Sequence, residues 1–259
     1  MMDIDQLFSL KGRSALVTGG SRGIGRMIAE GFLRAGARVY ISARKADACD
    51  ATAKDLSALG HCVSLPADVS TLAGVRQLVA GYQQHEKTLD ILVNNAGAAW
   101  GAPYAEFPES GWDKVVDLNL KTPFFLTQAM APLLRASVAA SGRPAKVIHI
   151  ASIDGITVNP WDTYSYAASK AGLIHLTKRM ALELAPQRIV VSAIAPGPFA
   201  SNMNKDARDH EAEVATRVPL GRIGNPDDMA GAAIFLASRA GDYVVGSTLV
   251  VDGGTAWAR

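Results

Sequence analysis

Short runs of β-branched and apolar residues alternate along this chain with longer segments whose apolar residues recur at helical spacing. The strand-like runs are residues 15–17, 39–41, 91–93, 147–150, 190–191 and 249–251, and the helix-like segments are 25–35, 72–85, 111–134, 164–185 and 226–237. Each crossover between parallel strands must return over a face of the sheet, so this alternation predicts a parallel sheet with helices on both faces. The fold class expected is α/β, a doubly wound sheet that binds ligands at the carboxyl ends of its strands.

Composition narrows the possible partners and location. The 259 residues are 49% hydrophobic and show no break in composition, which predicts a single domain over residues 1–259. A net charge of +2 from scattered basic residues argues against nucleic acid as a partner. No long apolar run predicts a membrane span, and the acidic start is unlike a secretory signal, so we expect a cytoplasmic protein. Neither the two cysteines nor the five histidines have metal-ligand spacing, and no metal is expected.

Two stretches interrupt the alternation. Residues 136–145 read as a frayed helix end and loop. Residues 197–217 form a long connection of the kind that often serves as a lid or binding element.

A glycine-rich turn, TGGSRGIG over residues 18–25, follows the first predicted strand and leads into a helix. Glycines permit positive φ and close backbone approach, and the free amides of a helix start can receive a pyrophosphate. A tight turn without a ligand is the alternative, and the spacing departs from Gly-x-Gly-x-x-Gly. The context nevertheless predicts a Rossmann-type dinucleotide site. Its candidate residues are Gly19, Ser21, Arg22, Gly23, Ile24 and Gly25.

The end of the second predicted strand indicates which dinucleotide is bound. Residues 40–45 carry no carboxylate to hold a ribose diol and end in Arg44 and Lys45. With Arg22 in the glycine turn, Arg44 is suited to clamp a 2′-phosphate. The sequence therefore predicts NADP(H), although both arginines could simply be solvated.

Tyr166 and Lys170 lie four residues apart in a predicted helix and so share one face. A nearby ammonium stabilises a phenolate and draws the pKa of the tyrosine toward working pH, which suits proton transfer. Tyr164 is a poorer candidate because it meets Ala168 at the same spacing. In isolation such a pair is often a surface coincidence.

Together these residues resemble the short-chain dehydrogenase/reductase family. The resemblance covers nearly the whole chain and rests on ordered marks: Thr18, Gly19, Gly23, Ile24, Gly25, Asp68, Asn94, Asn95, Ala96, Gly97, Asn119, Ser152, Tyr166, Lys170, Pro196 and Gly197. It implies a catalytic group of Asn119, Ser152, Tyr166 and Lys170. It also implies further cofactor contacts: with the adenine, along the turn at 94–97 and beside the nicotinamide. The residues implied in these contacts are Asp68, Val69, Asn95, Ala96, Gly97, Tyr166, Lys170, Pro196 and Gly197.

The mechanism that this resemblance implies is carbonyl reduction. Ser152 hydrogen-bonds the substrate carbonyl, and Tyr166 donates a proton to its oxygen as hydride reaches the carbon. Lys170 holds the nicotinamide ribose and lowers the tyrosine pKa, while Asn119 positions a water that resupplies the proton. Individually, Ser152 and Asn119 could instead serve turns or backbone groups.

On the substrate side of the expected site, the chain resembles the β-ketoacyl (3-oxoacyl) reductase branch, including the reductase associated with rhamnolipid biosynthesis. Residues 94–101 and 111–112 carry this resemblance. The candidate substrate pocket is Trp100, Ile153, Asp154, Trp161, Phe199 and Met203, although such apolar residues are as often plain packing. Asp154 departs from the small or apolar residue expected there; it favours a polar or cationic substrate group or is an ordinary turn residue. Carrier-protein docking would need cations such as Lys205, Arg208 and Arg217.

The sequence thus predicts an NADP-dependent oxidoreductase of fatty acid metabolism that reduces a 3-oxoacyl thioester, on acyl-carrier protein or CoA, or a similar ketone. One alternative is a dehydrogenase of a secondary alcohol, sugar or steroid. The other is a non-catalytic cofactor-sensing regulator. The resemblance implies a homotetramer, or a dimer, built partly from the helices at 111–134 and 164–185, and His149 is interpreted as a core residue.

Overall fold

A seven-stranded parallel sheet forms the centre of the computed structural model, which describes residues 3–201 and 203–258. The strand order is β3-β2-β1-β4-β5-β6-β7, and every neighbouring pair is parallel. The strands are β1 (Ser14–Thr18), β2 (Arg38–Ser42), β3 (Cys62–Ser64), β4 (Ile91–Asn94), β5 (Ala145–Ile150), β6 (Ile189–Pro196) and β7 (Thr248–Val251). The predicted Rossmann-type doubly wound fold is confirmed.

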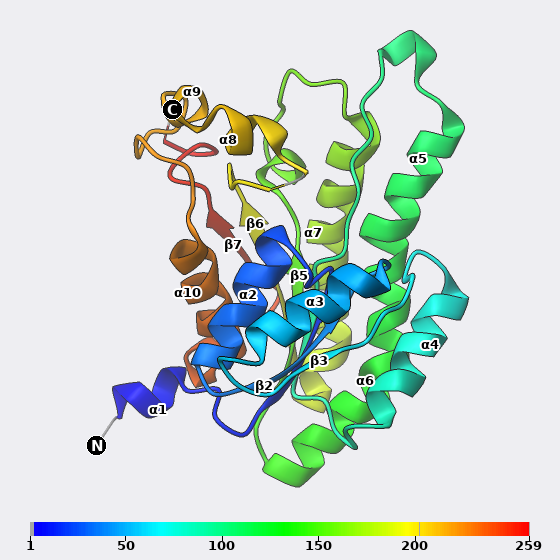
Figure 1. Cartoon of the computed structure of the whole chain (residues 1–259), viewed down its shortest axis with the longest axis vertical. Coiled ribbons are helices and arrows are strands. Elements are labelled where there is room, and N and C mark those ends of the chain that lie inside the picture. The colour runs from blue at the N-terminus through cyan, green and yellow to red at the C-terminus, as the bar shows by residue number, and fades with distance from the viewer. Residues whose placement is uncertain (1–2, 202, 259) are drawn as a thin grey trace.

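Helices cover both faces of the sheet (Figure 1). On one face α2 (Gly23–Arg34), α3 (Ala46–Leu56) and α10 (Pro226–Ala237) bury apolar side chains against the strands. On the other face α4 (Leu72–Gln83), α6 (Thr122–Ser141) and α7 (Tyr164–Leu184) do the same. The remaining elements are α1 (Ile4–Phe8), η1 (Tyr104–Glu106), α5 (Glu109–Val116), η2 (Asp117–Lys121), η3 (Ile153–Gly155), η4 (Ala185–Gln187), α8 (Lys205–Asp209), α9 (Glu211–Ala215) and η5 (Arg239–Gly241).

The strand order reverses direction between β1 and β4. From β1 the chain proceeds outward to β2 and β3, and it then returns to β4 on the other side of β1. The loops after β1 and β4 therefore diverge toward opposite faces, which leaves a crevice above their carboxyl ends. The glycine turn after β1 and residues 95–98 after β4 both lie at this switch point.

All six predicted strands lie within observed strands, but β3 and α3 have no counterpart among the predicted elements. The three residues of β3 include only one β-branched side chain, and the buried face of α3 is built from small residues and Leu56. Residues 136–145, predicted as a frayed helix end and loop, hold the regular end of a helix: α6 continues to Ser141 and ends at Gly142 in the left-handed region, φ +65°. The 197–217 connection contains α8 and α9.

Within the described part of the chain, no helix is long and apolar enough to cross a membrane. The same residues contain no group of three or more histidine, cysteine, aspartate or glutamate side chains arranged to hold a metal ion.

Candidate active site

In the turn between β1 and α2, the glycine positions are unsuited to side chains. Gly19 and Gly23 have φ of +65° and +52°, a region that L side chains rarely adopt. A Cβ on Gly25 would collide with the carbonyl oxygen of Gly19 and the side-chain amide of Asn95. Arg22 precedes the helix and gives it no side-chain cap, so the first amides of α2 stay free. This is a backbone cradle with the donors that a pyrophosphate needs.

Thr18 and Asn95 lock this cradle to the turn after β4. The Thr18 hydroxyl donates to the Val93 carbonyl (3.2 Å) and accepts from the amides of Asn95 (3.0 Å) and Ala96 (3.1 Å). In return the Asn95 side chain donates to the carbonyls of Thr18 (2.8 Å) and Gly19 (3.2 Å). Sequence analysis quoted Thr18 only as part of the motif. Its place as the last residue of a buried strand was the available signal.

Two guanidinium groups are free near the end of β2. Arg22 and Arg44 are exposed, and neither guanidinium group has a hydrogen bond or ion pair within residues 3–201 and 203–258. The carboxylate of Asp68, beyond β3, accepts from the amide (3.1 Å) and hydroxyl (2.7 Å) of Ser70. Next to it, the Val69 carbonyl accepts from Thr122 on α6 (2.6 Å). These donors fit a dinucleotide that carries an extra phosphate. Residues 40–45 contain no acidic side chain that would repel this phosphate.

Ser152 follows β5 and begins η3. Its Oγ accepts a hydrogen bond from the Asp154 amide (3.1 Å), which fixes the hydroxyl oxygen. The side chain is buried, and its hydrogen bond to Tyr166 lowers the pKa of that phenol. A serine in this state is a hydrogen-bond donor at the mouth of the crevice.

Tyr166 and Lys170 share one face of α7, as the spacing predicts. The Lys170 ammonium lies 5.5 Å from the centre of the Tyr166 ring and donates to the Ile150 carbonyl of β5 (2.7 Å). Burial lowers the pKa of Lys170 to about 8 and raises the pKa of Tyr166 to about 12. The expected lowering of the tyrosine pKa by the ammonium is not seen in this state: burial has the largest effect on this pKa, and the Ser152 hydrogen bond is what opposes it. Tyr166 is a protonated phenol at working pH.

Asn119 lies in η2, a π-helical turn that joins α5 and α6 into one continuous helical stretch. Its side-chain oxygen accepts from the Ala98 amide (2.8 Å), and its nitrogen donates to the Ala98 carbonyl (2.9 Å) and the Ser169 hydroxyl (3.1 Å). Ser169 in turn donates to the Tyr166 carbonyl (2.8 Å). The amide thus ties the loop after β4 to the helix that carries Tyr166 and Lys170.

The end of β6 supplies the remaining predicted cofactor contacts. The Gly197 amide, after Pro196, donates to the Val251 carbonyl of β7 (2.9 Å). A Cβ on Gly197 would collide with Asp252, so only glycine lets these two chain segments pass. Pro196 and Gly197 lie at the same end of the sheet as Ser152 and the glycine turn.

The predicted substrate-pocket residues fall into two groups. Trp161 and Met203 are 53% and 51% exposed, and Ile153 and Asp154 are half-buried in η3 beside Ser152. By contrast, Phe199 is 2% exposed in the core with its ring against Gly224.

Trp100, the sixth predicted pocket residue, packs its ring on Gly111 of α5, with the Lys114 ammonium 5.1 Å from the ring centre. For Phe199 and Trp100 the packing interpretation is the better one. Asp154 has a raised pKa, mainly because burial penalises its charge.

Cations in the 197–217 connection are engaged with neighbouring acids. Arg208 pairs with Asp209 and Arg217 pairs with Glu213. The side chain of Lys205 lies outside what the structure describes. These pairs leave less free positive charge for a carrier protein than the sequence suggested.

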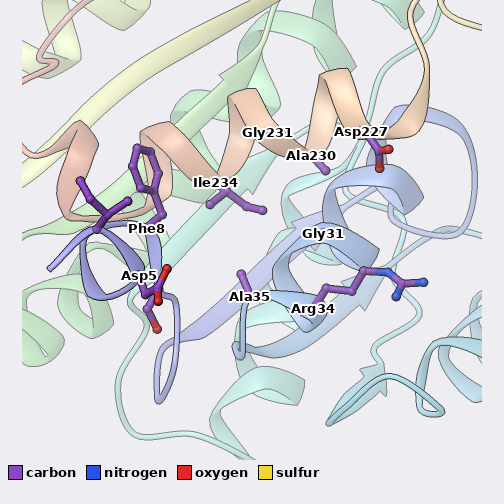
Figure 2. Close-up of a pocket in the computed structure, with 11 residues that line it drawn as sticks. Asp5, Phe8, Gly31, Arg34, Ala35, Asp227, Ala230, Gly231 and Ile234 are labelled. Carbon is purple, nitrogen blue, oxygen red and sulfur yellow. The ribbon is translucent and has the colours of Figure 1, made fainter.

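Two other depressions lie apart from these residues. The larger, about 570 Å³, is an open groove between α1, the second half of α2 and α10, on the outer helical layer (Figure 2). Its lining includes Phe8, Arg34, Ala230 and Ile234, and it holds none of the predicted site residues.

The second, about 280 Å³, is lined by the aromatic cluster of Tyr104, Phe107, Trp112 and Tyr164. The rings of this cluster meet edge to face. This cluster was not predicted from the sequence, since Tyr164 comes from a distant part of the chain and only the fold brings it against the other three rings.

The chain is similar to known proteins along nearly its full length. A family model described as enoyl-(acyl carrier protein) reductase matches residues 19–256. The rhamnolipids biosynthesis 3-oxoacyl-[acyl-carrier-protein] reductase of Pseudomonas aeruginosa is 49% identical over 95% of this chain and 97% of that protein. The 2-dehydro-3-deoxy-D-gluconate 5-dehydrogenase of Escherichia coli is 40% identical over 95% and 96%. The Pseudomonas aeruginosa RhlG/NADP active-site complex superposes with a TM-score of 0.93 at 47% identity, covering 97% of this chain and 99% of that one.

Proposed function

Because the chain belongs to the short-chain dehydrogenase/reductase family of oxidoreductases, we propose that it uses NADPH to reduce the carbonyl group of a 3-oxoacyl thioester. One observation carries this proposal. A buried serine hydroxyl, a protonated phenol and a buried ammonium converge at the carboxyl end of the sheet, beside an open pyrophosphate cradle.

NADP(H) fits the residues at the switch point. The backbone from Gly19 to Gly25 would hold the pyrophosphate, and Arg22 and Arg44 would pair with the 2′-phosphate. On the adenine side lie Asp68 and Val69, and toward the nicotinamide lie the turn after β4 and Pro196 with Gly197. This choice over NAD(H) is supported by the NADP complexes among the similar structures and by the two exposed arginines.

The bound cofactor supplies the hydride, and the chain supplies the proton and the orientation. Ser152 donates a hydrogen bond to the substrate carbonyl oxygen. Tyr166 Oη then transfers its proton to that oxygen, and its high pKa keeps the proton available until the oxygen becomes basic. Lys170 holds the ribose hydroxyls and balances the phenolate charge, while Asn119 keeps the loop after β4 and α7 in register. The proposed water at Asn119 would replenish the proton.

A 3-oxoacyl thioester is favoured over a keto sugar acid by the charge beside Ser152. The Asp154 carboxylate is half-buried there, and partial burial strengthens its repulsion of a substrate carboxylate. A thioester carries no such charge next to its ketone. Exposed Trp161 and Met203 offer apolar area for an acyl chain. The carrier is acyl-carrier protein or CoA.

Conversion of a sugar acid is the second candidate, because the 2-dehydro-3-deoxy-D-gluconate 5-dehydrogenase of Escherichia coli is 40% identical to this chain. A regulator that binds NADP(H) without turnover is the third candidate, and the intact set of Ser152, Tyr166 and Lys170 weighs against it.

Oxidation of NADPH by the purified chain tests these candidates. We expect turnover with 3-oxoacyl thioesters on CoA and on carrier protein, and little with keto sugar acids. Tyr166→Phe removes only the hydroxyl and should lower kcat by about 10² or more in a folded protein. Faster turnover of keto sugar acids would favour the second candidate. NADPH binding without turnover of any carbonyl, or a fully active Tyr166→Phe variant, would contradict the proposed reaction.

A further inference from the structure

A buried polar pair lies one residue below the catalytic end of the sheet. Asn94 ends β4, His149 lies in β5, and the two residues are register partners. Register partners in adjacent parallel strands point to the same face, here the face covered by α6 and α7. Their exposed fractions are 4% and 0%. Every polar atom of this pair therefore needs a partner inside the protein.

The hydrogen bonds around His149 fix its tautomer. Thr177 of α7 donates its hydroxyl proton to the Leu173 carbonyl (2.7 Å), so its oxygen can only accept from the ring nitrogen 2.9 Å away. His149 Nδ1 therefore carries the proton, and Nε2 presents a bare lone pair. Within the described residues Nε2 has no partner. Burial, and the charge of Lys170, lower the pKa of His149 to about 3, which keeps the ring neutral.

Asn94 presents a second unpartnered acceptor beside the first. Its side-chain nitrogen donates to the Thr127 hydroxyl of α6 (3.1 Å), whereas its oxygen has no partner among the residues that the structure describes. Two buried acceptors on neighbouring strands cannot satisfy each other, but a single water donates one hydrogen to each. Leaving both unsatisfied would destabilise the folded chain, because each buried acceptor would have lost its hydrogen bond to water without gaining another.

His149 is also next to the anchor of the catalytic lysine. Lys170 donates to the carbonyl of Ile150, the residue after His149. Lys170, Leu173 and Thr177 follow one another on the sheet-facing side of α7, and all three are buried. Two polar ties thus connect β5 to α7: one through Lys170 itself and one through His149 and Thr177.

We propose that His149 is a positioning residue that holds α7, and with it Lys170 and Tyr166, on β5 through Thr177, while a buried water joins its Nε2 to Asn94. The expected effect of this arrangement on kcat rests on the proposed reductase function, whereas the hydrogen-bond geometry of His149 does not depend on it.

Three substitutions separate the two ring nitrogens. An asparagine amide can occupy the place of Nδ1 and donate to Thr177, a glutamine amide occupies the place of Nε2, and leucine replaces neither. We expect His149→Asn to keep kcat within about threefold of the unmodified chain. His149→Gln and His149→Leu should lower kcat by about tenfold or more, because a small shift of α7 misplaces both catalytic groups. In these two variants the alkaline limit of kcat should also move to higher pH, since a looser Lys170 is better hydrated.

Ser192→Ala is the matched control. Ser192 lies on β6 and is equally buried. Its hydroxyl donates to the Val244 carbonyl (3.0 Å), away from α7. This variant should lose stability without a change in kcat or its pH profile. Equal kinetic losses in Ser192→Ala and His149→Leu, or no rescue by His149→Asn, would overturn the positioning role.

Two measurements test the geometry without turnover. Nitrogen NMR of the histidine ring should show Nδ1 protonated and no titration between about pH 5 and 8, where a free histidine titrates. A high-resolution crystal structure of the full chain should show one water bonded to His149 Nε2 and Asn94. The opposite tautomer, or an empty space between these atoms, would overturn the assignment. If the unmodified chain reduces no carbonyl, the proposed function fails while these two results stand.

Discussion

Asp154 exerts an electrostatic effect on both members of the proton-transfer pair. Its negative charge raises the pKa of Lys170, against the larger lowering by burial, and raises the pKa of Tyr166 further. Both effects keep the pair protonated, with lysine as a cation and tyrosine as an acid. That is the form from which a carbonyl is reduced. In the proposed reaction, the same carboxylate would therefore both disfavour anionic substrates and favour the reductive direction.

Replacement of Asp154 by asparagine should shift the pH dependence of reduction. Without the carboxylate charge, the pKa values of Lys170 and Tyr166 both fall, so the groups lose their protons at lower pH. We expect the alkaline limit of kcat in Asp154→Asn to move to lower pH, while activity near pH 6 is retained. A profile over the full pH range, compared with the unmodified chain, measures this shift. A limit that stays in place or moves upward would show that the Asp154 charge does not act on the pair.

Arg44 determines cofactor choice in the proposed site. Loss of one charge-assisted hydrogen bond costs about 1.5–3 kcal/mol, so Arg44→Ala should raise the KM for NADPH by about 10- to 100-fold. The KM for NADH should hardly change, because NADH lacks the 2′-phosphate. Lys45→Ala, at the neighbouring exposed cation, is the control and should have the smaller effect. Equal losses with both cofactors would contradict a specific phosphate contact.

At the scale of elements, the β1–α2 turn depends on the absence of a side chain at Gly25. A methyl group there meets both the Gly19 carbonyl and the Asn95 amide, and the turn must open to admit it. Gly25→Ala should lower stability by about 1–3 kcal/mol and abolish NADPH binding. Thermal unfolding and a binding titration check both effects. Gly231→Ala, in open space on α10, should instead stabilise the protein by up to about 1 kcal/mol and leave binding intact.

The elements that sequence analysis found were those with strong periodicity. Buried strands such as β1 and β5 consist mostly of apolar and β-branched residues, and the apolar face of α2 recurs with the helical period. The strand β3 is too short to carry a pattern. The π turn at η2 was not predictable, since nothing in residues 117–121 marks a change of helical pitch, yet this turn is what directs Asn119 toward Ala98.

At the scale of the whole molecule, parallel crossovers gather the site from distant parts of the chain. The glycine turn, residues 95–97, Ser152 and Gly197 were predictable because each follows a strand, and parallel strands end at one edge. Tyr166 and Lys170 were predictable from their helical spacing. The contacts between site residues were not. The pairing of His149 with Thr177 and of Thr18 with Asn95 depends on strand register and helix rotation, which local sequence does not specify.

An exposed aromatic surface bears on the quaternary structure of the protein. The aromatic cluster at the start of α5 and α7 leaves Tyr104 and Trp112 substantially exposed, and exposed aromatic area of this kind marks association surfaces. We expect a homotetramer, with a dimer as the alternative, measured by size-exclusion chromatography with light scattering. Trp112→Glu should shift the assembly toward smaller species, because a charge cannot be buried there without a partner. Tyr243→Glu, at a fully exposed tyrosine outside the cluster, should leave the mass unchanged. A monomer with full activity would show that the site is complete within one chain and that this cluster serves another purpose.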